Sequence, residues 1–277
     1  LRMFRGDGGR TAVEIAYELP EPHVDRLTLE AAAWRGPGDL VARARSFARR
    51  EKLHRLAGGR AVGRMRFELP PRELVLGLQA VAVRSPSARS RSAPPAESAA
   101  PAELGWVAFA RDTLELTQYR ADSLMMSDLM LAHQVRDGVG GLFDMGGVIA
   151  VPRVDSTIEN AWLHLYFEIY PSRGILAERR AVAVSYSVRS LPPRRWDFWD
   201  QFDPDFHRRM DADRRPVVQA TFLFQPQADL ERQQLSIDLR ALEPGLHELT
   251  VELVDTRTGA TTSRSAEFEY APVAAGS

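Results

Sequence analysis

The chain has 277 residues, of which 44% are hydrophobic and 26% are charged. This length suits two domains of ordinary size, and this composition is typical of a globular protein with a buried core. Acidic residues (37) and basic residues (36) nearly cancel, which excludes the chain-wide basic field that would hold a nucleic acid.

The chain contains no cysteine, which excludes disulfides, thiolate catalysis and cysteine-ligated metals. No apolar run approaches the roughly 20 residues that a membrane-spanning helix needs, so we expect no transmembrane segment. No signal peptide is visible, but the sequence opens at Leu1 rather than at a methionine. We therefore expect that a targeting segment has been removed.

Alternation of apolar and polar residues is the main structural signal along the chain. Near the N-terminus, Val13, Ile15 and Tyr17 share one face of a predicted strand, while Glu14 and Glu18 take the other. The same alternation recurs in segments 74–78, 163–169, 182–188, 235–239 and 249–253. Each segment presents an apolar face to a core and a polar face to water, as in antiparallel sheets with one wet side.

The segment from Ala42 to Leu56 fits two structures. Its length and composition suit a helix. Leu40 and Val41, followed by alternating Arg43 and Arg45, suit a strand equally well.

Short strands separated by Gly- and Pro-containing turns predict an all-β fold of two consecutive immunoglobulin-like antiparallel β-sandwiches. A weak internal repeat supports two copies of one domain, because Val13–Pro20 resembles Leu165–Pro171. We place the first sandwich at residues 1–120 and the second at residues 121–277, with the boundary near Tyr119 to Asp122.

Two insertions interrupt this pattern. Residues 84–101 are rich in Ser, Ala, Pro and Arg, cannot bury much apolar surface, and predict a mobile loop. The second insertion, residues 192–216, is dense in aromatic residues, Asp and Arg.

The aromatic insertion is the predicted partner-binding site. A sandwich needs only a short turn here, and long connections are usually functional or disordered. Five aromatic residues between Trp196 and Phe206 argue against disorder. The candidate residues are the aromatics Trp196, Phe198, Trp199, Phe202 and Phe206, rimmed by Arg194, Arg195, Arg208 and Arg209. Trp and Arg are enriched at binding hot spots. The alternative is that this segment folds back to cover its own sheet edge or the domain junction.

Motifs that carry chemistry are scarce. The six histidines form no HxH or HExxH pair, and there is no GxSxG, P-loop or GxGxxG after a strand. Glycines between Gly138 and Gly147 could cradle a phosphate, but a turn entering an edge strand is favoured, since no helix start follows. Asp203 and Asp205 come closest to a calcium loop, but no glycine follows them. Ser127 and Asp128 read as a turn or strand start. We therefore predict no enzyme, no metal and no cofactor.

Several segments of the second half resemble the GWxTD-domain proteins, a bacterial family. Leu124–Ala132 is similar to their LSDLxLA segment and Leu165–Tyr170 to their YFEIY strand. Leu242–Gly245 and Val251–Gly259 resemble their L-x-PG and D-x-x-TG ending. The GWxTD motif itself is absent, since Gly105-Trp106 is followed by Val107. The resemblance implies only the tandem β-sandwich part, exported to the periplasm or cell surface, and it carries no catalytic residue.

The sequence thus favours a non-enzymatic, periplasmic or extracellular interaction or scaffold protein that docks as a subunit on a larger protein assembly. A membrane protein complex is one candidate for that assembly. One concrete alternative is a periplasmic accessory subunit of a photosynthetic reaction-centre and light-harvesting complex. Another is a carbohydrate- or peptide-binding β-sandwich, in which the aromatic residues would form a ligand platform.

Overall fold

The structure is a computed structural model that describes residues 1–20, 26–36, 38–49, 54–56, 60–84, 103–191 and 216–272. These residues form four β-sheets, one short α-helix and one 3-10 turn, so the predicted all-β class is confirmed. The predicted mobile loop lies outside the described residues except for Arg84, and so does the aromatic insertion except for Pro216.

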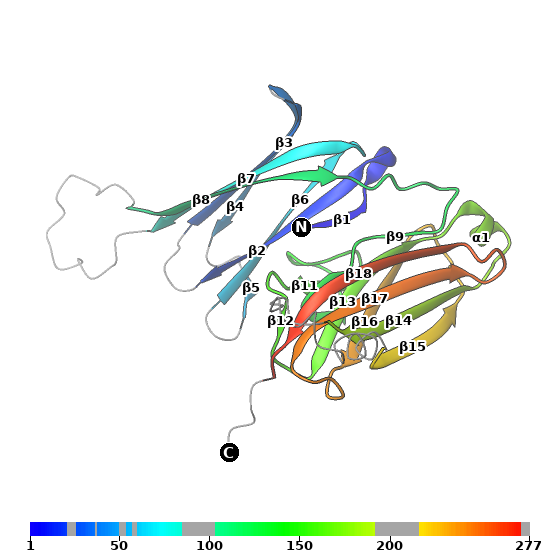
Figure 1. Cartoon of the computed structure of the whole chain (residues 1–277). Coiled ribbons are helices and arrows are strands. Elements are labelled where there is room, and N and C mark those ends of the chain that lie inside the picture. The colour runs from blue at the N-terminus through cyan, green and yellow to red at the C-terminus, as the bar shows by residue number, and fades with distance from the viewer. Residues whose placement is uncertain are drawn as a thin grey trace, which may run out of the picture. The chain divides into compact units, whose positions relative to one another are not determined.

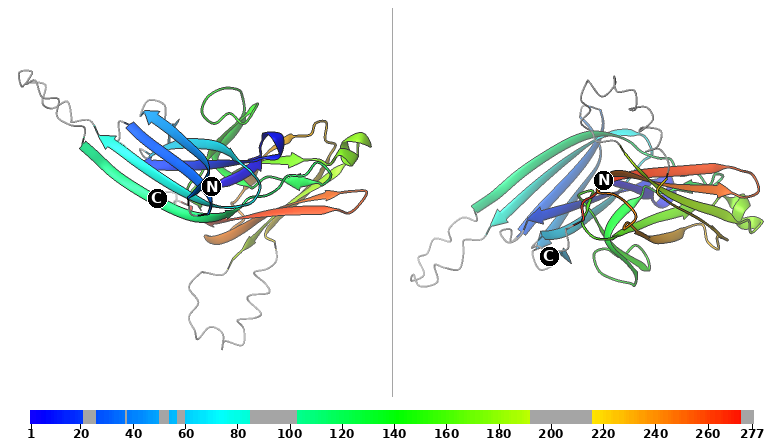
Figure 2. Two further views of the ribbon diagram at one scale, coloured as in Figure 1. Left: turned by 90° about the horizontal axis from the view of Figure 1, so that it is seen from above. Right: turned by 60° about the horizontal axis from the view of Figure 1, so that its bottom comes forward.

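The chain divides into two compact units, Met3–Gln118 and Tyr119–Ser277. The strands of the first unit are β1 Arg2–Arg5, β2 Thr11–Pro20, β3 Arg26–Gly36, β4 Asp39–Arg49, β5 His54–Arg55, β6 Arg60–Leu69, β7 Glu73–Arg84 and β8 Glu103–Glu115. A 3-10 turn, Asp7–Gly9, separates β1 from β2. These strands form two four-stranded sheets, in the orders β1-β2-β6-β5 and β4-β3-β7-β8. Figure 2 shows the long strands β7 and β8 side by side.

The two sheets of the first unit share one core. Val13, Ile15 and Met65 from one sheet cluster with Leu29 and Leu76 from the other. The alternation places the apolar side chains of Val13, Ile15, Leu74 and Leu76 in the core as expected. The expectation that Glu14 faces water is wrong, because Glu14 is 2% exposed and pairs with Arg64 and Arg66.

Glycine permits one close contact in this unit. Tyr17 lies directly opposite Gly63 in the β2–β6 register, and a Cβ at Gly63 would overlap the Tyr17 ring. The missing side chain therefore leaves room for the aromatic ring between the strands.

The ambiguous segment after Asp39 is a strand, β4. Ala42 and Ala44 pack against the core of the first unit. Arg43 and Arg45 point the other way, where both reach Glu30 of the neighbouring strand β3. Period-2 alternation thus decides the structure here, and the helix alternative is wrong for residues 42–49.

The second unit contains β9 Met125–Met126, β10 Met130–Asp137, β11 Val148–Pro152, β12 Thr157–Ile158, β13 Trp162–Tyr170, α1 Arg173–Ala177, β14 Val182–Ser190, β15 Val218–Phe224, β16 Glu231–Asp238, β17 Gly245–Asp255 and β18 Thr261–Tyr270. One sheet has the order β11-β10-β13-β16, with β9 also paired to β13. The other has the order β12-β18-β17-β14-β15 (Figure 1). Apart from the short parallel pair β12–β18, the neighbouring strands whose pairing is described run antiparallel.

A single apolar core lies between these two sheets. Leu163, Leu165 and Phe167 of β13 face Val184 of β14 and Val251 of β17 within it. Helix α1 connects β13 to β14, and Ile175 buries its side chain in the same core (Figure 1). Ser172 caps the helix by accepting a hydrogen bond from the Ile175 N–H.

One expectation for β13 is wrong. The alternation predicted that Tyr166 and Glu168 face water, yet Tyr166 is fully buried and Glu168 is 5% exposed. Tyr170, two residues further on the same face, is buried as well. The polar face can be buried because each carboxylate oxygen of Glu168 accepts a hydrogen bond from one of these two tyrosines.

Candidate functional site

The predicted partner-binding residues Trp196, Phe198, Trp199, Phe202 and Phe206, with Arg194, Arg195, Arg208 and Arg209, lie outside the described residues. The structure therefore neither brings them together nor separates them. It does describe the strands on both sides of them, β14 and β15.

The frame that carries the aromatic insertion is well fixed. Strand β14 pairs with β15 from Val182↔Phe224 to Val188↔Val218. Beyond that ladder, the Leu191 N–H donates to the Leu246 carbonyl at 2.7 Å, and the Val217 N–H donates to the Val188 carbonyl at 2.8 Å. The residues that flank the insertion on both sides are thus held by hydrogen bonds to the same sheet.

The sheet that carries this frame has an outward surface of small hydroxyl side chains, which we name the hydroxyl face. Its members are Ser185, Ser187, Thr221, Thr250, Ser263 and Ser265. Hydroxyls bond across strands between Ser185 and Thr221 and between Thr250 and Ser265, each at 2.9 Å. Leu223, on the same side of β15, is 66% exposed. The same face also carries the long side chains of Arg189, Gln219, Glu248, Glu252 and Glu267, and Arg189 pairs with Glu248 at 2.7 Å.

Two of the segments that carry the family resemblance bond to each other. The buried Ser127 donates its N–H to the Glu168 carbonyl at 2.9 Å, and its Oγ accepts the Glu168 N–H at 2.9 Å. The Ser127 hydroxyl donates to the Asp128 carbonyl at 2.8 Å. Ser127 therefore joins the segment before β10 to strand β13, and its hydroxyl is engaged in that joint. Ser127 and Asp128 lie in the short connection between β9 and β10, which begins at Met130.

Glu168 is the centre of a buried polar cluster. Tyr166 donates its hydroxyl to Oε1 at 2.9 Å and Tyr170 donates to Oε2 at 2.5 Å. Tyr119 packs edge-on against Tyr170, with ring centroids 4.8 Å apart. Burial, reinforced by the charges of Asp128 and Glu168, raises the pKa of Tyr119 above its ordinary value.

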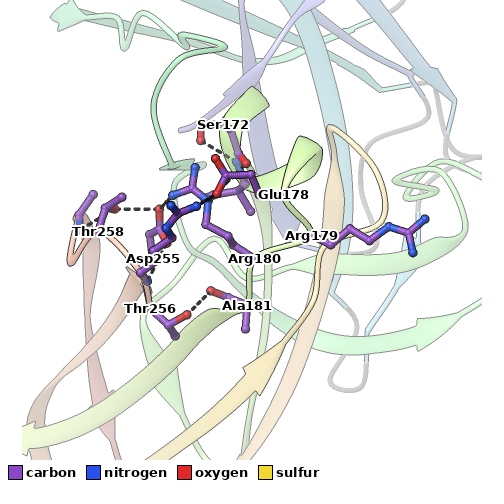
Figure 3. A network of polar contacts seen from close by, with 12 residues as sticks. Ser172, Glu178, Arg179, Arg180, Ala181, Asp255, Thr256 and Thr258 are labelled. Atoms are coloured by element: carbon purple, nitrogen blue, oxygen red, sulfur yellow. Dashed lines mark hydrogen bonds and ion pairs between the residues drawn. The ribbon is translucent and has the colours of Figure 1, made fainter.

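A second polar network surrounds Arg180, just after α1 (Figure 3). Its guanidinium donates to Asp255 Oδ2 at 2.5 Å and to the Gly174 carbonyl at 3.3 Å. Glu178 lies 3.5 Å from Arg180 Nε and also pairs with Arg257. Arg179, with a positive φ of 51°, ends the helix, and its side chain points away from the network in Figure 3. The network ties α1 to the turn between β17 and β18.

Asp255 begins the D-x-x-TG segment of the predicted ending. It accepts hydrogen bonds from the Thr258 hydroxyl at 2.8 Å and from the Arg257 N–H at 3.1 Å. Burial raises the pKa of its carboxyl, but these hydrogen bonds and the charge of Arg180 outweigh burial and lower that pKa overall. Asp255 therefore stays ionised inside the turn that it organises.

The glycine-rich segment before β11 is a turn built on Asp144. The Asp144 carboxylate accepts the N–H groups of Gly140, Gly146 and Gly147 at 2.5, 2.7 and 3.0 Å. Positive φ angles at all three glycines point these N–H groups inward. Strand β11 follows at the edge of its sheet, so the prediction of a turn entering an edge strand is confirmed. A phosphate would have to displace the carboxylate from these donors.

The structure forms two serine–histidine pairs that the sequence analysis did not foresee. Ser190 and His247 lie 3.4 Å apart, and His164 and Ser236 lie 2.8 Å apart. Both are directly opposite pairs on neighbouring strands, so the register explains each bond. His247 is 1% exposed and its other ring nitrogen bonds the Glu243 carbonyl. Burial and the charge of Arg153 lower the pKa of His164. Sequence spacing gives no signal for such pairs because the partners are 57 and 72 residues apart.

Within the described ranges, no cluster of three or more His, Asp or Glu side chains is placed to hold a metal ion. Likewise, none of the described helices is long and apolar enough to cross a membrane. Asp203 and Asp205, the nearest approach to a calcium loop, lie in the segment that the structure does not describe.

Neither a protein-family model nor a curated protein matches this chain. The resemblance to GWxTD-domain proteins therefore rests on the short segments named above. In this structure, two of those segments meet through the hydrogen bonds between Ser127 and Glu168, and another forms the turn that begins at Asp255.

Proposed function

We propose that this chain is a non-enzymatic, exported interaction subunit that docks on a larger protein assembly. In this proposal each pair of sheets is an immunoglobulin-like β-sandwich of the GWxTD type, and the protein works in the periplasm or at the cell surface of a bacterium. The antiparallel sheets that share one core in each unit support the sandwich.

One observation carries the functional proposal. The described ends of strands β14 and β15 hold the aromatic insertion in a fixed frame at one edge of a sheet. A hairpin between these strands needs only a few residues, yet the chain places Trp196, Trp199 and three phenylalanines there. Val217, which directly precedes β15, and Leu223 on β15 are exposed apolar residues beside it. Rigid elements that present aromatic anchors with an arginine rim suit protein docking.

The polar clusters of the second unit support a structural rather than a chemical role. The hydroxyl of Ser127 donates to the Asp128 carbonyl, and the oxygens of Glu168 and Asp255 accept hydrogen bonds from neighbouring groups. These three groups therefore serve local structure, whereas the Ser236–His164 and Ser190–His247 pairs do place a hydroxyl within hydrogen-bond reach of an imidazole.

The test is a double variant, Trp196→Ala with Trp199→Ala. The matched control is Trp162→Ala, since Trp162 is 45% exposed in the same unit and lies at the start of β13. Affinity capture on the membrane and periplasmic fractions of the native host measures docking, and thermal melting measures stability. We expect capture to fail for the double variant alone, with a melting temperature close to that of the wild type.

A melting temperature that falls sharply, with capture falling in parallel, would contradict the proposal and make the aromatic segment part of the core. Binding of a glycan array by the wild type, lost in the double variant, would replace protein docking by carbohydrate binding.

A further inference from the structure

Strand β15 has one edge without a partner strand among the residues that the structure describes. It is the last strand in the order β12-β18-β17-β14-β15 and pairs only with β14 there. In an antiparallel strand, alternate residues direct their N–H and C=O groups to opposite edges. Half of the β15 backbone therefore presents hydrogen-bonding groups away from β14, which is a template for another strand.

The composition of β15 leaves this edge open to pairing. Its seven residues, VQATFLF, include no charged residue, no proline and no glycine. Strand β16, the edge of the other sheet in the same unit, carries Glu231, Arg232 and Asp238. Charged residues on an edge strand oppose pairing with a second sheet. Within the part of the chain that the structure describes, charged residues thus protect the edge of β16 but not that of β15.

The sequence around β15 is symmetric about Thr221. Pro216 and Pro226 stand five residues on either side, so both ends of a pairing centred there are closed by residues that cannot donate to a ladder. In an antiparallel pair of two β15 strands about this centre, Ala220 would meet Phe222 and Val218 would meet Phe224 on the core side. Each of these two pairs thus joins a small apolar side chain to a large aromatic one.

The outward side fits the same symmetry. Thr221 would meet its own copy, and Gln219 would meet Leu223, so no like charges come together. A shift of the register by two residues in either direction would bring one proline towards the ladder, which favours the centred pairing.

We propose that two copies of this chain associate through antiparallel pairing of β15 with β15, about a two-fold axis at Thr221. The pairing joins two five-stranded sheets into one and continues the core side of each sheet into the other. This proposal is independent of the docking function, because it requires none of the residues of the aromatic insertion.

The contact is small, since it consists of one seven-residue strand from each copy. Interfaces well below 1,200 Å² are weak, and a dissociation constant on the order of 100 µM is expected. The dimer should therefore appear in sedimentation equilibrium as protein concentration rises through this range, and as a monomer well below it.

The first variant is Thr221→Lys, which places two ammonium groups opposite each other at the axis. Like charges directly opposite across a ladder are destabilising, so we expect the dissociation constant to rise at least about ten-fold. Ser263→Lys is the matched control, because Ser263 is an exposed hydroxyl residue of the same sheet on β18, away from β15. It should leave the dimer unchanged.

The second variant is Thr221→Cys, which adds one thiol to a chain without cysteine. At the axis this thiol meets its own copy, so a short bis-maleimide should link the dimer at least about ten-fold faster than in Ser263→Cys. This readout does not depend on the stability of the lysine variant.

A wild-type protein that remains monomeric at concentrations near 1 mM overturns the proposal. Equal cross-linking of the two cysteine variants also overturns it. So does a dimer that survives Thr221→Lys but is lost in the Trp196→Ala, Trp199→Ala variant, since the aromatic segment would then make the contact.

Discussion

Among the described residues of the second unit, two carboxylates are buried, Glu168 at 5% exposure and Asp255 at 3%, and they are stabilised by different means. Asp255 is paired with a guanidinium, that of Arg180, and with donors of its own turn. Glu168 receives the hydroxyls of Tyr166 and Tyr170, and no ion pair with an arginine is seen at it among the described residues. Within one unit, an ion pair thus stabilises the buried Asp255 carboxylate, and two neutral hydroxyl donors stabilise the buried Glu168 carboxylate.

The difference lies in what each carboxylate connects. The Asp255 network joins α1 to the β17–β18 turn, at the end of a hairpin where an arginine can still reach water. The Glu168 cluster is confined to one face of β13, where consecutive same-face residues supply both donors. A guanidinium brings a charge that itself needs desolvation, whereas phenol groups bring none. The following variants separate these two solutions.

The largest effect is expected for Arg180→Met. The substitution removes the charge that faces the buried Asp255 carboxylate but keeps a flexible side chain of similar length. Removing one partner of a buried ion pair costs about 3 kcal/mol, measured as the free energy of unfolding of the second unit in urea. Arg240→Met is the control, because the Arg240–Asp238 pair is exposed. A loss below about 1 kcal/mol would show that Thr258 and the Arg257 N–H suffice for Asp255.

A smaller loss is expected for Tyr170→Phe, which removes one of the two hydroxyls from Glu168. A hydrogen bond to a charged group contributes about 2 kcal/mol, measured by the same urea unfolding. Tyr186→Phe is the matched control, since Tyr186 packs against the core and no hydrogen bond of its hydroxyl is seen among the described residues. If both substitutions cost the same, the Glu168 cluster adds nothing beyond ring packing.

The two sites also differ in how they respond to pH. The folded state lowers the pKa of Asp255, so its contribution is present above the unfolded pKa and is lost as pH falls through the folded value. Acid should therefore destabilise the second unit through this site. Thermal melting between pH 7 and about 2.5 should show a shallower acid decline for Asp255→Asn than for the wild type. An unchanged acid decline would remove Asp255 as its source.

The smallest effect concerns Tyr119, beside the Glu168 cluster. The folded state raises the pKa of Tyr119, so its contribution is present below the unfolded pKa and is lost as pH rises above about 10. We expect Tyr119→Phe to flatten the alkaline decline of the melting temperature and to leave the acid decline unchanged. An alkaline decline identical to that of the wild type would contradict this assignment.

The strands were predictable because their cores follow period-2 alternation. Val182 to Val188 and Leu249 to Leu253 show it plainly, and β14 and β17 cover both segments. Segment 42–49 was ambiguous, because alanine suits a helix as well as a small core site. In the observed strand, Arg43 pairs with Glu30 on the neighbouring strand β3. No pattern within segment 42–49 predicts that contact.

The polar clusters were not predictable in the same way. Tyr166 and Glu168 look like a wet strand face, since a sequence shows which side chains share a face but not whether that face is covered. The Arg180–Asp255 bond joins residues 75 apart, and the Ser127–Glu168 bond joins residues 41 apart. Such bonds depend on strand order, which alternation does not encode. The docking residues from Arg194 to Arg209 remain predictions from composition.

The hydroxyl face has a consequence for how this protein would crystallise. Serine and threonine lose little side-chain entropy when they are fixed, unlike the long lysine and glutamate side chains that cover most protein surfaces. Ser187, Thr250 and Ser265 lie on one face of the sheet. Thr250 and Ser265 form a hydrogen bond across strands, and Ser187 lies directly opposite Thr250. A neighbouring molecule can therefore contact these hydroxyl residues at small entropic cost, whereas Glu248, Glu252 and Glu267 on the same face oppose such a contact. Glutamate at Ser187 and Ser265 would be expected to move those contacts elsewhere.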